Sequence, residues 1–578
     1  MAAVSESSVA YPIPNDESTP TVSTAPRPRH VGPNIFPNFP VFTRLIGYAA
    51  QGEAVAIDDR TYNIKASYSQ LLTDVLHVRN VLYGTLSADV LNRLWANEEV
   101  YFNLLAPASY EYAVAFLAIL AIGGIIVPLS PALPEQEALY YVKTSRAVVM
   151  LSSTKNARSG RNIARAVSST FNPGYQSIDI APLIGRPPLR AADMLVSCDH
   201  FLDYHGAGLV IFTSGTTGPP KGALRRRSFI DGQATRIADL YALNRGDRVM
   251  HILPVHHATG IGTTFLPFLL SGACVEFHSS GFDPVKVWEH WRAKRLTYFS
   301  GVPTMYMRMM AHYETVLKNL PPHVAESYIA GARHFRQLLC GTSALPRPLA
   351  DKWKALMGGR RILERYGTTE FSGAFTIPPG DKECPDGSVG KVMVGTDVKL
   401  SEGDQGEILV KSPFMFTKYI FDQAATEAAF DSEGYYRSGD IARRGGDYYF
   451  IMGRASVDIL KSGGYKISAL DVEREILGLD YVSEVMVVGV EDEEFGQRVA
   501  AAIVLKPDTI GSLSLDRLRH ELRSKLASYK NPTMLRVVPE LRKTVTGKVV
   551  KKALKTELFP PNGHPDVQIW RTQTRPRL

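Results

Sequence analysis

The stretch FTSGTTGPPKG, from Phe212 to Gly222, combines hydroxyl side chains, glycines, prolines and one lysine. Glycine and proline break both helices and strands, so the stretch predicts a loop. It follows an apolar run from Gly208, which predicts a short buried strand. Backbone N–H groups of a glycine-rich loop can surround phosphate oxygens, and Lys221 adds a positive charge. The sequence therefore predicts a phosphate-binding loop at the end of a strand.

This loop departs from the Walker A loop of other nucleotide-binding proteins. A Walker A loop has Gly directly before its lysine and Ser or Thr directly after it. Here Lys221 lies between Pro220 and Gly222, so we expect a phosphate-binding loop of another kind. A surface turn without a ligand is the alternative, which the length of the loop and the strand before it disfavour.

Strand-like and helix-like segments alternate from about residue 40 to residue 450. This alternation predicts an α/β fold of parallel sheets covered by helices, in which ligands bind at the carboxyl ends of strands. The apolar run from Ala113 to Val127 is too short to span a bilayer and contains Gly123 and Gly124. We expect a buried helix, a turn and a strand there, and no transmembrane segment.

The segment after about Gly453 predicts a separate small α+β unit. Ser468 and Asp471 form a capping-box pattern before a short helix, and apolar runs from Val485 and Ala501 predict strands. Leucines spaced along one face predict a second helix. They are Leu515, Leu518, Leu522 and Leu526.

Composition and charge limit the classes of function. The chain has 578 residues, of which 45% are hydrophobic and 21% charged, as expected for a globular protein of two or more domains. The net charge of +8 permits anionic ligands without requiring nucleic acid. The basic stretch from Arg225 to Arg227 is short and has no aromatic platform beside it. We expect the solvated start of a helix there, and no nucleic-acid partner.

The cysteines and the chain ends bear on location. The four cysteines lie far apart and form no C-x-x-C pair, which disfavours a zinc site or a disulfide framework and fits a reducing compartment. Cytoplasmic location is the first expectation. Acidic residues near the start disfavour a mitochondrial transit peptide, and the final Pro-Arg-Leu is a loose relative of a peroxisomal signal. Mitochondrial and peroxisomal locations stay open.

Four further stretches recur in a fixed order after the loop. They are ERYGTTE at Glu364–Glu370, YYRSGDIA at Tyr435–Ala442, GRASVDILKSGGYKIS at Gly453–Ser468 and TVTGKVVKKAL at Thr544–Leu554. Together with the loop they resemble the adenylate-forming (ANL) superfamily, which includes acyl-CoA synthetases and adenylation domains, from about residue 40 to residue 557.

The resemblance implies a fold and a domain division. The fold is a large N-terminal α/β domain of several sheets that carries a small, mobile α+β C-terminal domain. The expected parts are a disordered leader over 1–35, an AMP-binding domain over 36–453, a lid domain over 454–558 and a tail over 559–578.

The resemblance also implies a reaction in two steps. A carboxylate attacks the α-phosphate of Mg-ATP, which releases pyrophosphate and gives an acyl-adenylate; a thiol, usually that of coenzyme A, then displaces AMP. Because the first step brings two anions together, cations and N–H donors must offset their repulsion.

Individual positions carry over from the motifs. The residues implied at the nucleotide are Thr213, Ser214, Gly215, Thr216, Thr217, Gly218 and Lys221 around the β- and γ-phosphates, Gly341, Thr342, Ser343, Tyr366 and Gly367 around the adenine, and Asp440 at the ribose hydroxyls. Thr369 would bind the α-phosphate, and Glu370 would hold Mg²⁺ as an oxygen ligand.

The later motifs would serve domain motion and the second step. Arg454 belongs to the hinge motif, and Gly463 and Gly464 would let the pantetheine of coenzyme A pass close to the backbone. Lys548 resembles the mobile catalytic lysine, which can bridge the carboxylate and the α-phosphate. Its alternative is one more solvated lysine beside Lys551 and Lys552.

A histidine pair lies where the family has a gate. His256, with His257, would stand at the tunnel for the carboxylate or the pantetheine. Metal binding together with His251 is disfavoured, because no acidic or cysteine partner is adjacent in sequence.

Within the superfamily the motifs look closest to malonyl-CoA synthetases. Arg365 lies directly before the Tyr-Gly pair, where that group has an arginine facing the acyl pocket, and a guanidinium can clamp a second carboxylate. Arg308 is a second candidate for this role, and a salt bridge inside the domain is the alternative for Arg365. Thr368 replaces the methionine common in the group, so another small or medium-chain acid stays open.

The leading hypothesis is an AMP-forming acid-thiol ligase that uses ATP, Mg²⁺ and coenzyme A on a small-molecule carboxylic acid. A stand-alone adenylation enzyme that loads a separate acyl carrier protein is the nearest alternative. A silent nucleotide-binding scaffold is disfavoured because Lys548, Glu370 and Asp440 are all present. Primary and secondary metabolism both stay open.

Overall fold

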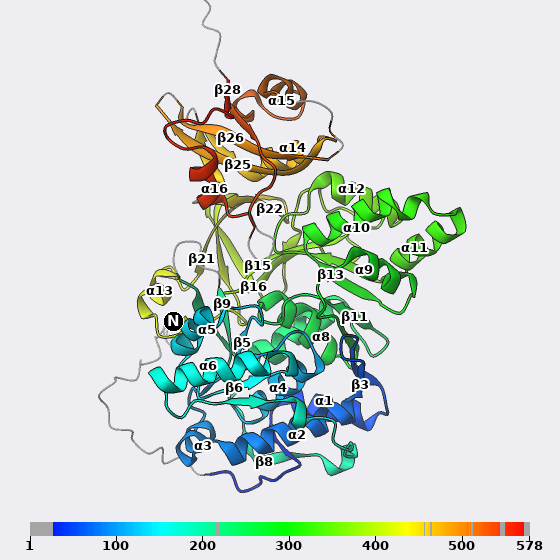
Figure 1. The fold of residues 1–578 in the computed structure, drawn as a ribbon, viewed down its shortest axis with the longest axis vertical. Helices are drawn as coiled ribbons and strands as arrows, with labels where there is room; N and C mark the ends of the chain where they lie inside the picture. Colours follow the sequence, from blue (N-terminus) through cyan, green and yellow to red (C-terminus); the bar gives the residue numbers. More distant parts are fainter. Residues whose placement is uncertain are drawn as a thin grey trace, which may run out of the picture.

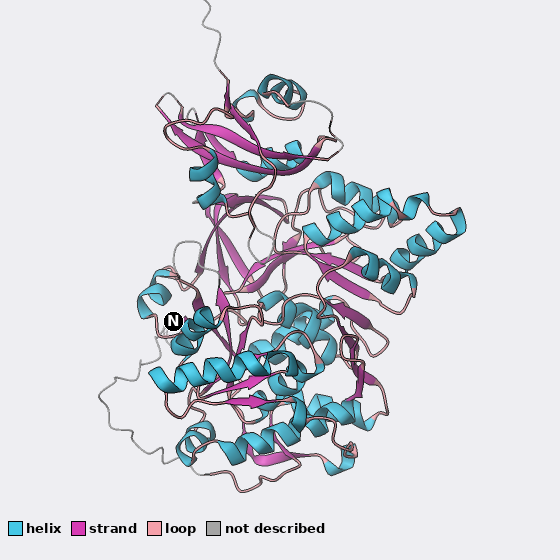
Figure 2. Cartoon of the chain, viewed as in Figure 1, coloured by secondary structure: helices cyan, strands magenta, loops and turns pink. Residues whose placement is uncertain are grey.

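The computed structural model describes residues 27–213, 219–455, 457–462, 465–493, 495–507, 509, 513–543 and 549–570. A large N-terminal α/β domain with several sheets carries a small C-terminal domain, drawn in orange to red (Figure 1). Figure 2 shows strands running through the large domain with helices packed around and between them. This is the fold class that the sequence predicts.

The first large sheet carries the opening loop. Its strands, in spatial order, are β20 (Lys418–Tyr419), β10 (Lys221–Arg226), β9 (Ala207–Thr213), β5 (Ile125–Leu129), β4 (Tyr101–Leu105), β6 (Val149–Ser152) and β7 (Ser177–Asp179). Strands β9, β5, β4, β6 and β7 are parallel, and β10 returns antiparallel to β9. The loop therefore joins two strands of a hairpin at the carboxyl end of a parallel strand.

The second large sheet carries most of the other N-terminal motifs. Its strands, in spatial order, are β17 (Lys391–Val392), β16 (Ser372–Thr376), β15 (Leu363–Thr368), β14 (Gln337–Cys340), β13 (Tyr298–Gly301), β11 (Arg248–His251), β12 (Cys274–Phe277), β2 (Val55–Asp59) and β3 (Ile64–Ser67). The strands from β15 to β2 are parallel, whereas β3, β16 and β17 are antiparallel to their neighbours.

Helices fill the space around the two sheets. Those of the large domain are α1 (Pro40–Ala50), α2 (Tyr68–Thr85), α3 (Ala88–Trp95), α4 (Tyr110–Ala121), α5 (Glu135–Ser145), α6 (Ala157–Thr170), α7 (Ala234–Leu240), α8 (Leu266–Leu269), α9 (Pro284–Arg292), α10 (Pro303–Thr315), α11 (Pro322–His334), α12 (Arg347–Leu356) and α13 (Gln423–Ala428). Helices α5 and α6 pack on one face of the first sheet, α2, α4 and α8 lie between the sheets, and α9 to α12 cover the far face of the second.

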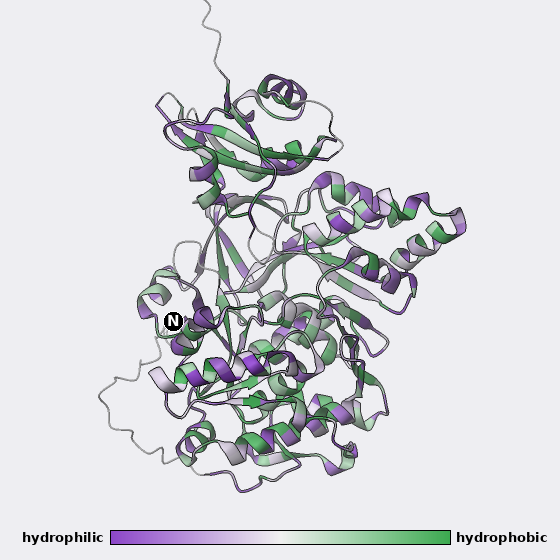
Figure 3. Ribbon diagram, in the orientation of Figure 1, coloured by the Kyte–Doolittle hydropathy of each residue, from purple (hydrophilic) through white to green (hydrophobic). Residues whose placement is uncertain are grey.

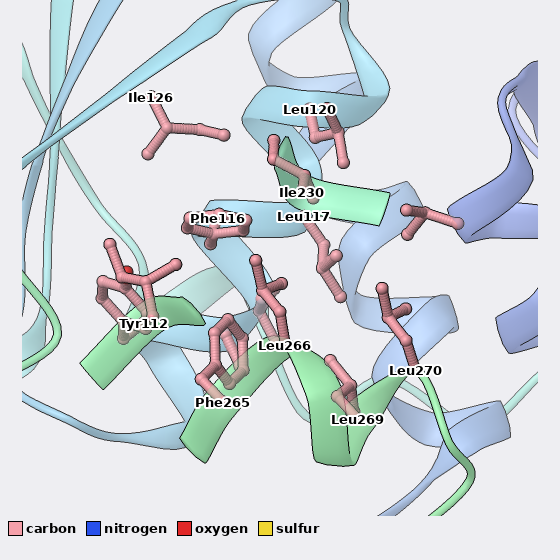
Figure 4. Packing of buried hydrophobic residues seen from close by; sticks show 14 of the residues in the cluster. Tyr112, Phe116, Leu117, Leu120, Ile126, Ile230, Phe265, Leu266, Leu269 and Leu270 are labelled. Carbon is pink, nitrogen blue, oxygen red and sulfur yellow. The ribbon is translucent and has the colours of Figure 1, made fainter. Parts of the chain in front are cut away.

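Helix α4 is the centre of the large domain. Every residue of α4 is buried, as its mostly apolar sequence requires, and its one acidic residue, Glu111, accepts a hydrogen bond of 2.7 Å from the N–H of Thr154. Phe116 meets Phe265 edge to face, and both lie among leucines of α4 and α8 (Figure 4). Gly123, at φ +84°, and Gly124, where a Cβ would lie 2.5 Å from Phe102, form the turn into β5. The predicted helix, turn and strand are confirmed.

Two smaller sheets complete the large domain, one antiparallel and one parallel. The four-stranded sheet has the order β18 (Asp397–Glu402), β19 (Gln405–Lys411), β21 (Tyr436–Gly445) and β22 (Tyr448–Arg454). A two-stranded sheet near the start of the described chain pairs β1 (Ile35–Asn38) with β8 (Leu195–Phe201). The four-stranded sheet lies between the large domain and the C-terminal domain in Figure 1.

The C-terminal domain is built on its own sheet. Its strands are β24 (Tyr465–Ser468), β23 (Ile459–Ser462), β26 (Gly496–Leu505), β27 (Met534–Val537) and β28 (Gln568–Ile569) in spatial order, with β25 (Val482–Asp492) also paired to β26. Helices α14 (Ala469–Leu477) and α15 (Leu515–Leu522) pack on one face, and α16 (Lys551–Leu558) packs on the other. The strands of this sheet are mostly green in Figure 3. Ser468 caps α14 as predicted, accepting a hydrogen bond from the N–H of Asp471.

The basic stretch after the loop differs from its prediction. Arg225 and Arg226 end β10, Arg227 begins the helical segment that follows, and both Arg225 and Arg227 are buried. Arg227 donates hydrogen bonds to the carbonyls of Gly123 and Asp203. A helix does start at Arg227, but the prediction that the stretch is solvated was wrong for Arg225 and Arg227, whose side chains lie in the interior.

Candidate active site

The base of the opening loop is fixed by strand pairing. Thr213 ends β9 and lies opposite Lys221, which begins β10. The Lys221 ammonium lies 5.2 Å from the ring centre of Tyr419 on β20. The predicted phosphate ligands Ser214, Gly215, Thr216, Thr217 and Gly218 lie outside the described residues.

Glu370 reaches the same tyrosine from the other sheet. It is buried just beyond the end of β15, and its Oε1 accepts a hydrogen bond of 2.9 Å from the Tyr419 hydroxyl. The other carboxylate oxygen, Oε2, makes no hydrogen bond to any residue that the structure describes, so it is available as a ligand for a cation. Tyr419 thus brings Lys221 and Glu370 together. No sequence pattern singled it out, because it lies on a short strand far from both motifs.

Arg225 supports the Thr369–Glu370 segment from below. Its guanidinium donates to the carbonyl of Thr369 and, at 2.7 Å, to the carbonyl of Phe414. Burial lowers the pKa of Arg225 to about 9, while the Glu370 carboxylate opposes that shift. A buried cation with carbonyl partners behind an anionic ligand can hold that ligand in place. The arginine run after the loop was visible in the sequence, but the inward direction of the Arg225 side chain was not.

The adenine and ribose motifs meet at one carboxylate. Asp440 on β21 accepts a hydrogen bond of 2.7 Å from the Tyr366 hydroxyl through Oδ2 and one of 2.8 Å from Arg454 Nε through Oδ1. Burial raises the pKa of Tyr366 well above its usual range, so the hydroxyl remains a donor. Each carboxylate oxygen has a second acceptor position, which leaves capacity for ribose hydroxyls.

Glycines shape the surface where the nucleotide is expected. Gly367 lies on β15 close to β16, and a Cβ there would lie 1.6 Å from the carbonyl oxygen of Ser372, so no other residue fits at this position. Gly341 follows β14, and a Cβ there would lie 3.3 Å from Arg365. Thr342 adopts a left-handed φ of +70°, and Ser343 follows it in the same exposed turn.

Glu364 fixes this turn and gives it a pH dependence. Its Oε2 accepts the N–H of Leu345 at 3.1 Å, and burial raises the carboxyl pKa from 4.5 to about 7. Between these two pH values the folded chain keeps a proton that the unfolded chain has lost, so this group removes stability as the pH rises.

We expect Glu364→Gln to reduce the loss of stability between pH 5 and pH 8, by on the order of 3 kcal/mol for a full shift of this size. The measurement is the free energy of unfolding of both proteins in denaturant at the two pH values. Glu383→Gln, at an exposed site nearby, is the control. Equal pH dependence in Glu364→Gln and the wild type would contradict the expectation.

Arg365 is a cation without a carboxylate partner among the described residues. Its Nη2 donates a hydrogen bond of 2.8 Å to Ser300 Oγ on β13, and burial lowers its pKa. The internal salt bridge that the sequence left open is not among its contacts. Arg308 is exposed on α10, where its guanidinium lies 5.0 Å from the ring centre of Phe282. The structure does not bring the two arginines into contact.

His256 is held as a neutral imidazole. Burial lowers its pKa to about 3, and its ring lies 4.4 Å from that of His257. Its Nδ1 is buried and has no hydrogen-bond partner within the part of the chain that the structure describes. An unpaired ring nitrogen can receive a polar ligand, which fits the gate that the resemblance implies.

One group of three potential metal ligands lies elsewhere. Glu276, His278 and His290 bring their ligand atoms within 4.8 Å of one another. Arg60 and Arg248 pair with the carboxylates of both Glu276 and Asp58, so two cations already balance the two acidic side chains here. Sequence reasoning missed this cluster because β12 and α9 contribute residues that are not adjacent. None of the three is a predicted site residue.

Several predicted residues lie outside the described parts of the chain. Besides the phosphate ligands, these are Gly463, Gly464 and Lys548. Their roles stay predictions. Among the described residues, no helix is long and apolar enough to cross a membrane.

A large α/β domain of several sheets followed by a small C-terminal domain defines the class of adenylate-forming enzymes. The chain belongs to the AMP-binding enzyme family: residues 48–420 match the AMP-binding enzyme model, and residues 471–548 match the AMP-binding enzyme C-terminal domain. It is an AMP-forming acid-thiol ligase of the acyl-CoA synthetase kind.

Three similar proteins illustrate the relationship. A CoA ligase of Gibberella moniliformis is 32% identical over 575 residues, covering 88% of this chain and 93% of its own length. The mitochondrial malonate–CoA ligase ACSF3 of Homo sapiens is 30% identical over 559 residues, covering 90% of this chain and 92% of its own. The ATP-bound crystal structure of MatB from Rhodopseudomonas palustris superposes with a TM-score of 0.75 at 24% identity, covering 92% of this chain and 100% of that one, and shares the fold.

Proposed function

We propose that the chain converts malonate, or a similar small dicarboxylic acid, into its coenzyme A thioester with ATP and Mg²⁺. The observation that carries the proposal is Arg365. Its guanidinium is held by Ser300 next to the adenine motif and has no carboxylate partner among the described residues. A small dicarboxylate would supply that partner, since a guanidinium can bind a carboxylate through two parallel hydrogen bonds. The human relative named a malonate–CoA ligase supports the same substrate class.

In the first step a carboxylate oxygen of the acid attacks the α-phosphorus of ATP, and pyrophosphate leaves. Arg365 would hold the second carboxylate and so orient the first. The Thr369 hydroxyl would donate to an α-phosphate oxygen, and the Lys548 ammonium would lie between the two anions and reduce their repulsion.

Glu370 would hold Mg²⁺ through the oxygen that Tyr419 leaves free, and the ion would neutralise phosphate charge. Lys221 would hold the outer phosphates together with the opening loop. Arg225 keeps the Glu370 segment in place from the interior.

In the second step the thiol of coenzyme A attacks the acyl carbonyl, loses its proton, and AMP leaves with the electrons of the broken C–O bond. Gly463 and Gly464 would line the path of the pantetheine, and neutral His256 would face the tunnel. The four cysteines are all free thiols, which supports a reducing compartment such as the cytoplasm. The name of the human relative makes the mitochondrion the alternative.

Arg365→Ala should lower kcat/KM for malonate by about 100-fold while leaving monocarboxylates nearly unchanged, because only the second carboxylate loses a charge-assisted pair. The measurement is pyrophosphate release with ATP, Mg²⁺ and coenzyme A across malonate, methylmalonate, short and medium monocarboxylates and aryl acids. Arg308→Ala tests the second candidate arginine.

A selective loss of malonate turnover in Arg308→Ala instead would move the clamp to α10. Efficient turnover of monocarboxylates by the wild type, unaffected by Arg365→Ala, would keep the ligase chemistry and remove the dicarboxylate.

A further inference from the structure

A lysine that follows the Lys548 motif is largely removed from solvent in the C-terminal domain, with 13% of its side chain exposed. Lys551, the first residue of α16, places its ammonium 2.5 Å from Asp458 Oδ1 and 2.7 Å from Glu473 Oε1, with the carbonyl of Val487 at 3.4 Å. Three acceptors satisfy the three N–H groups of the ammonium. The expectation that Lys551 is a solvated surface lysine was wrong. Lys552, its neighbour, is exposed.

The Lys551 cluster combines one cation and two carboxylates that are largely removed from solvent. Burial alone would lower the pKa of Lys551, but the two carboxylates outweigh burial and raise it. Burial raises the pKa of Glu473, although Lys551 opposes this. Removing the cation would leave two carboxylates close together in a poorly solvated place. An exposed lysine at the start of α16 would avoid the free-energy cost of removing these charges from water. The packing of α16 alone therefore does not explain the cluster.

Asp458 connects this cluster to the hinge motif. Its Oδ2 accepts the N–H of Arg454 at 3.0 Å, and its own N–H donates to the Arg454 carbonyl at 2.7 Å. The Arg454 side chain in turn holds Asp440 at the nucleotide site. A continuous series of contacts therefore runs from Lys551 through Asp458 and Arg454 to Asp440.

The other side of Lys551 leads to Lys548. Only Val549 and Val550 separate the two lysines. Val549 pairs with Lys543 across the base of the segment that contains Lys548, and the N–H of Val550 donates to the carbonyl of Arg542 at 3.1 Å. Lys551 is the residue that ties this base to the hinge.

We propose that Lys551 is a positioning residue for adenylation: through Asp458 and Glu473 it fixes the base of the Lys548 segment relative to the hinge at Arg454. The inference rests on the proposed role of Lys548 in the first step. Since Lys548 would withdraw for the second step, an error in its placement should affect adenylation and spare thioester chemistry. A purely structural cluster would affect both steps alike.

The experiment separates the two half-reactions in the full-length enzyme. Adenylation is followed as pyrophosphate release with ATP and malonate, with hydroxylamine in place of coenzyme A as the acceptor. The thioester step is followed in reverse as the single-turnover release of free thiol from malonyl-CoA when AMP is added; the AMP oxygen attacks the carbonyl, the C–S bond breaks, and the thiolate takes a proton. If another acid of the panel is preferred, that acid and its thioester replace malonate.

The variants are Lys551→Met, Lys551→Arg, the matched control Lys552→Met and the benchmark Lys548→Ala. Lys551→Met should lower kcat for adenylation by about 100-fold, as expected for a displacement of the reacting group by about 1 Å, with KM for ATP and thiol release within about threefold of wild type. Lys551→Arg should restore most of the activity, and Lys552→Met should match wild type.

Equal losses in the two half-reactions, or normal adenylation in Lys551→Met, would overturn the inference. Normal adenylation in Lys548→Ala would instead overturn the proposed role of Lys548. If Lys551→Met does not fold, Glu473→Gln takes its place, because it keeps the side-chain shape and leaves Asp458 to hold the lysine. About a tenfold loss of adenylation alone is then expected, and unchanged adenylation would count against the proposal.

Discussion

Asp440→Asn should lower kcat/KM for ATP by at least about 100-fold, since charge-assisted hydrogen bonds contribute about 1.5 to 3 kcal/mol each. The carboxylate now accepts from Tyr366 and Arg454 at once, and the ribose hydroxyls would add to that set. An amide has one oxygen instead of two and cannot balance the Arg454 charge. The loss should appear in the ATP dependence of pyrophosphate release at saturating acid.

Asp447→Asn is the matched control for this variant. Asp447 is exposed in the turn between β21 and β22, so the same chemical change occurs on the same hairpin away from the site. Wild-type kinetics in the control and a normal KM for ATP in Asp440→Asn would together remove the ribose role. Thermal unfolding of both variants separates a loss of binding from a loss of folding.

Glu370→Gln should lower kcat by about 1,000-fold and raise the Mg²⁺ concentration needed for half-maximal activity. Glutamine keeps the shape of the side chain and can still accept from the Tyr419 hydroxyl, but a neutral amide is a poor ligand for a hard cation. The change also removes the negative charge that balances the positive charge of buried Arg225. The measurement is the rate of pyrophosphate release as a function of Mg²⁺ concentration, which yields both kcat and the Mg²⁺ concentration for half-maximal activity.

Glu427→Gln controls for the substitution itself. Glu427 is exposed on α13, where its carboxylate accepts a hydrogen bond of 2.7 Å from the Gln423 amide. If Glu370→Gln requires no more Mg²⁺ than the wild type, the metal has another ligand. A fall in kcat without a change in Mg²⁺ dependence would assign Glu370 to nucleotide placement instead.

The sequence was most informative where one local pattern determines the outcome. Glycines and prolines marked the loop after β9, and the apolar run before Gly123 and Gly124 identified a fully buried helix. The order of the motifs led to the family, and the fold class followed from it. The first two signals are local patterns and the third is an order of motifs along the chain, so all three can be recognised from the sequence alone.

The tertiary contacts that hold the site together could not be predicted from such patterns. Tyr419 meets Glu370 because β20 pairs with β10, a pairing between segments far apart in the sequence. Arg225 and Lys551 both looked like solvated cations, since charged residues are mostly exposed. Only tertiary structure shows that carbonyls surround the first and carboxylates the second.

The central position of helix α4 has a consequence for how the protein unfolds. The apolar cluster around it takes side chains from both large sheets, so neither sheet can open without exposing the same residues to water. The C-terminal sheet has separate clusters of its own. The two large sheets should therefore unfold as one cooperative unit, while the small domain can lose its structure independently.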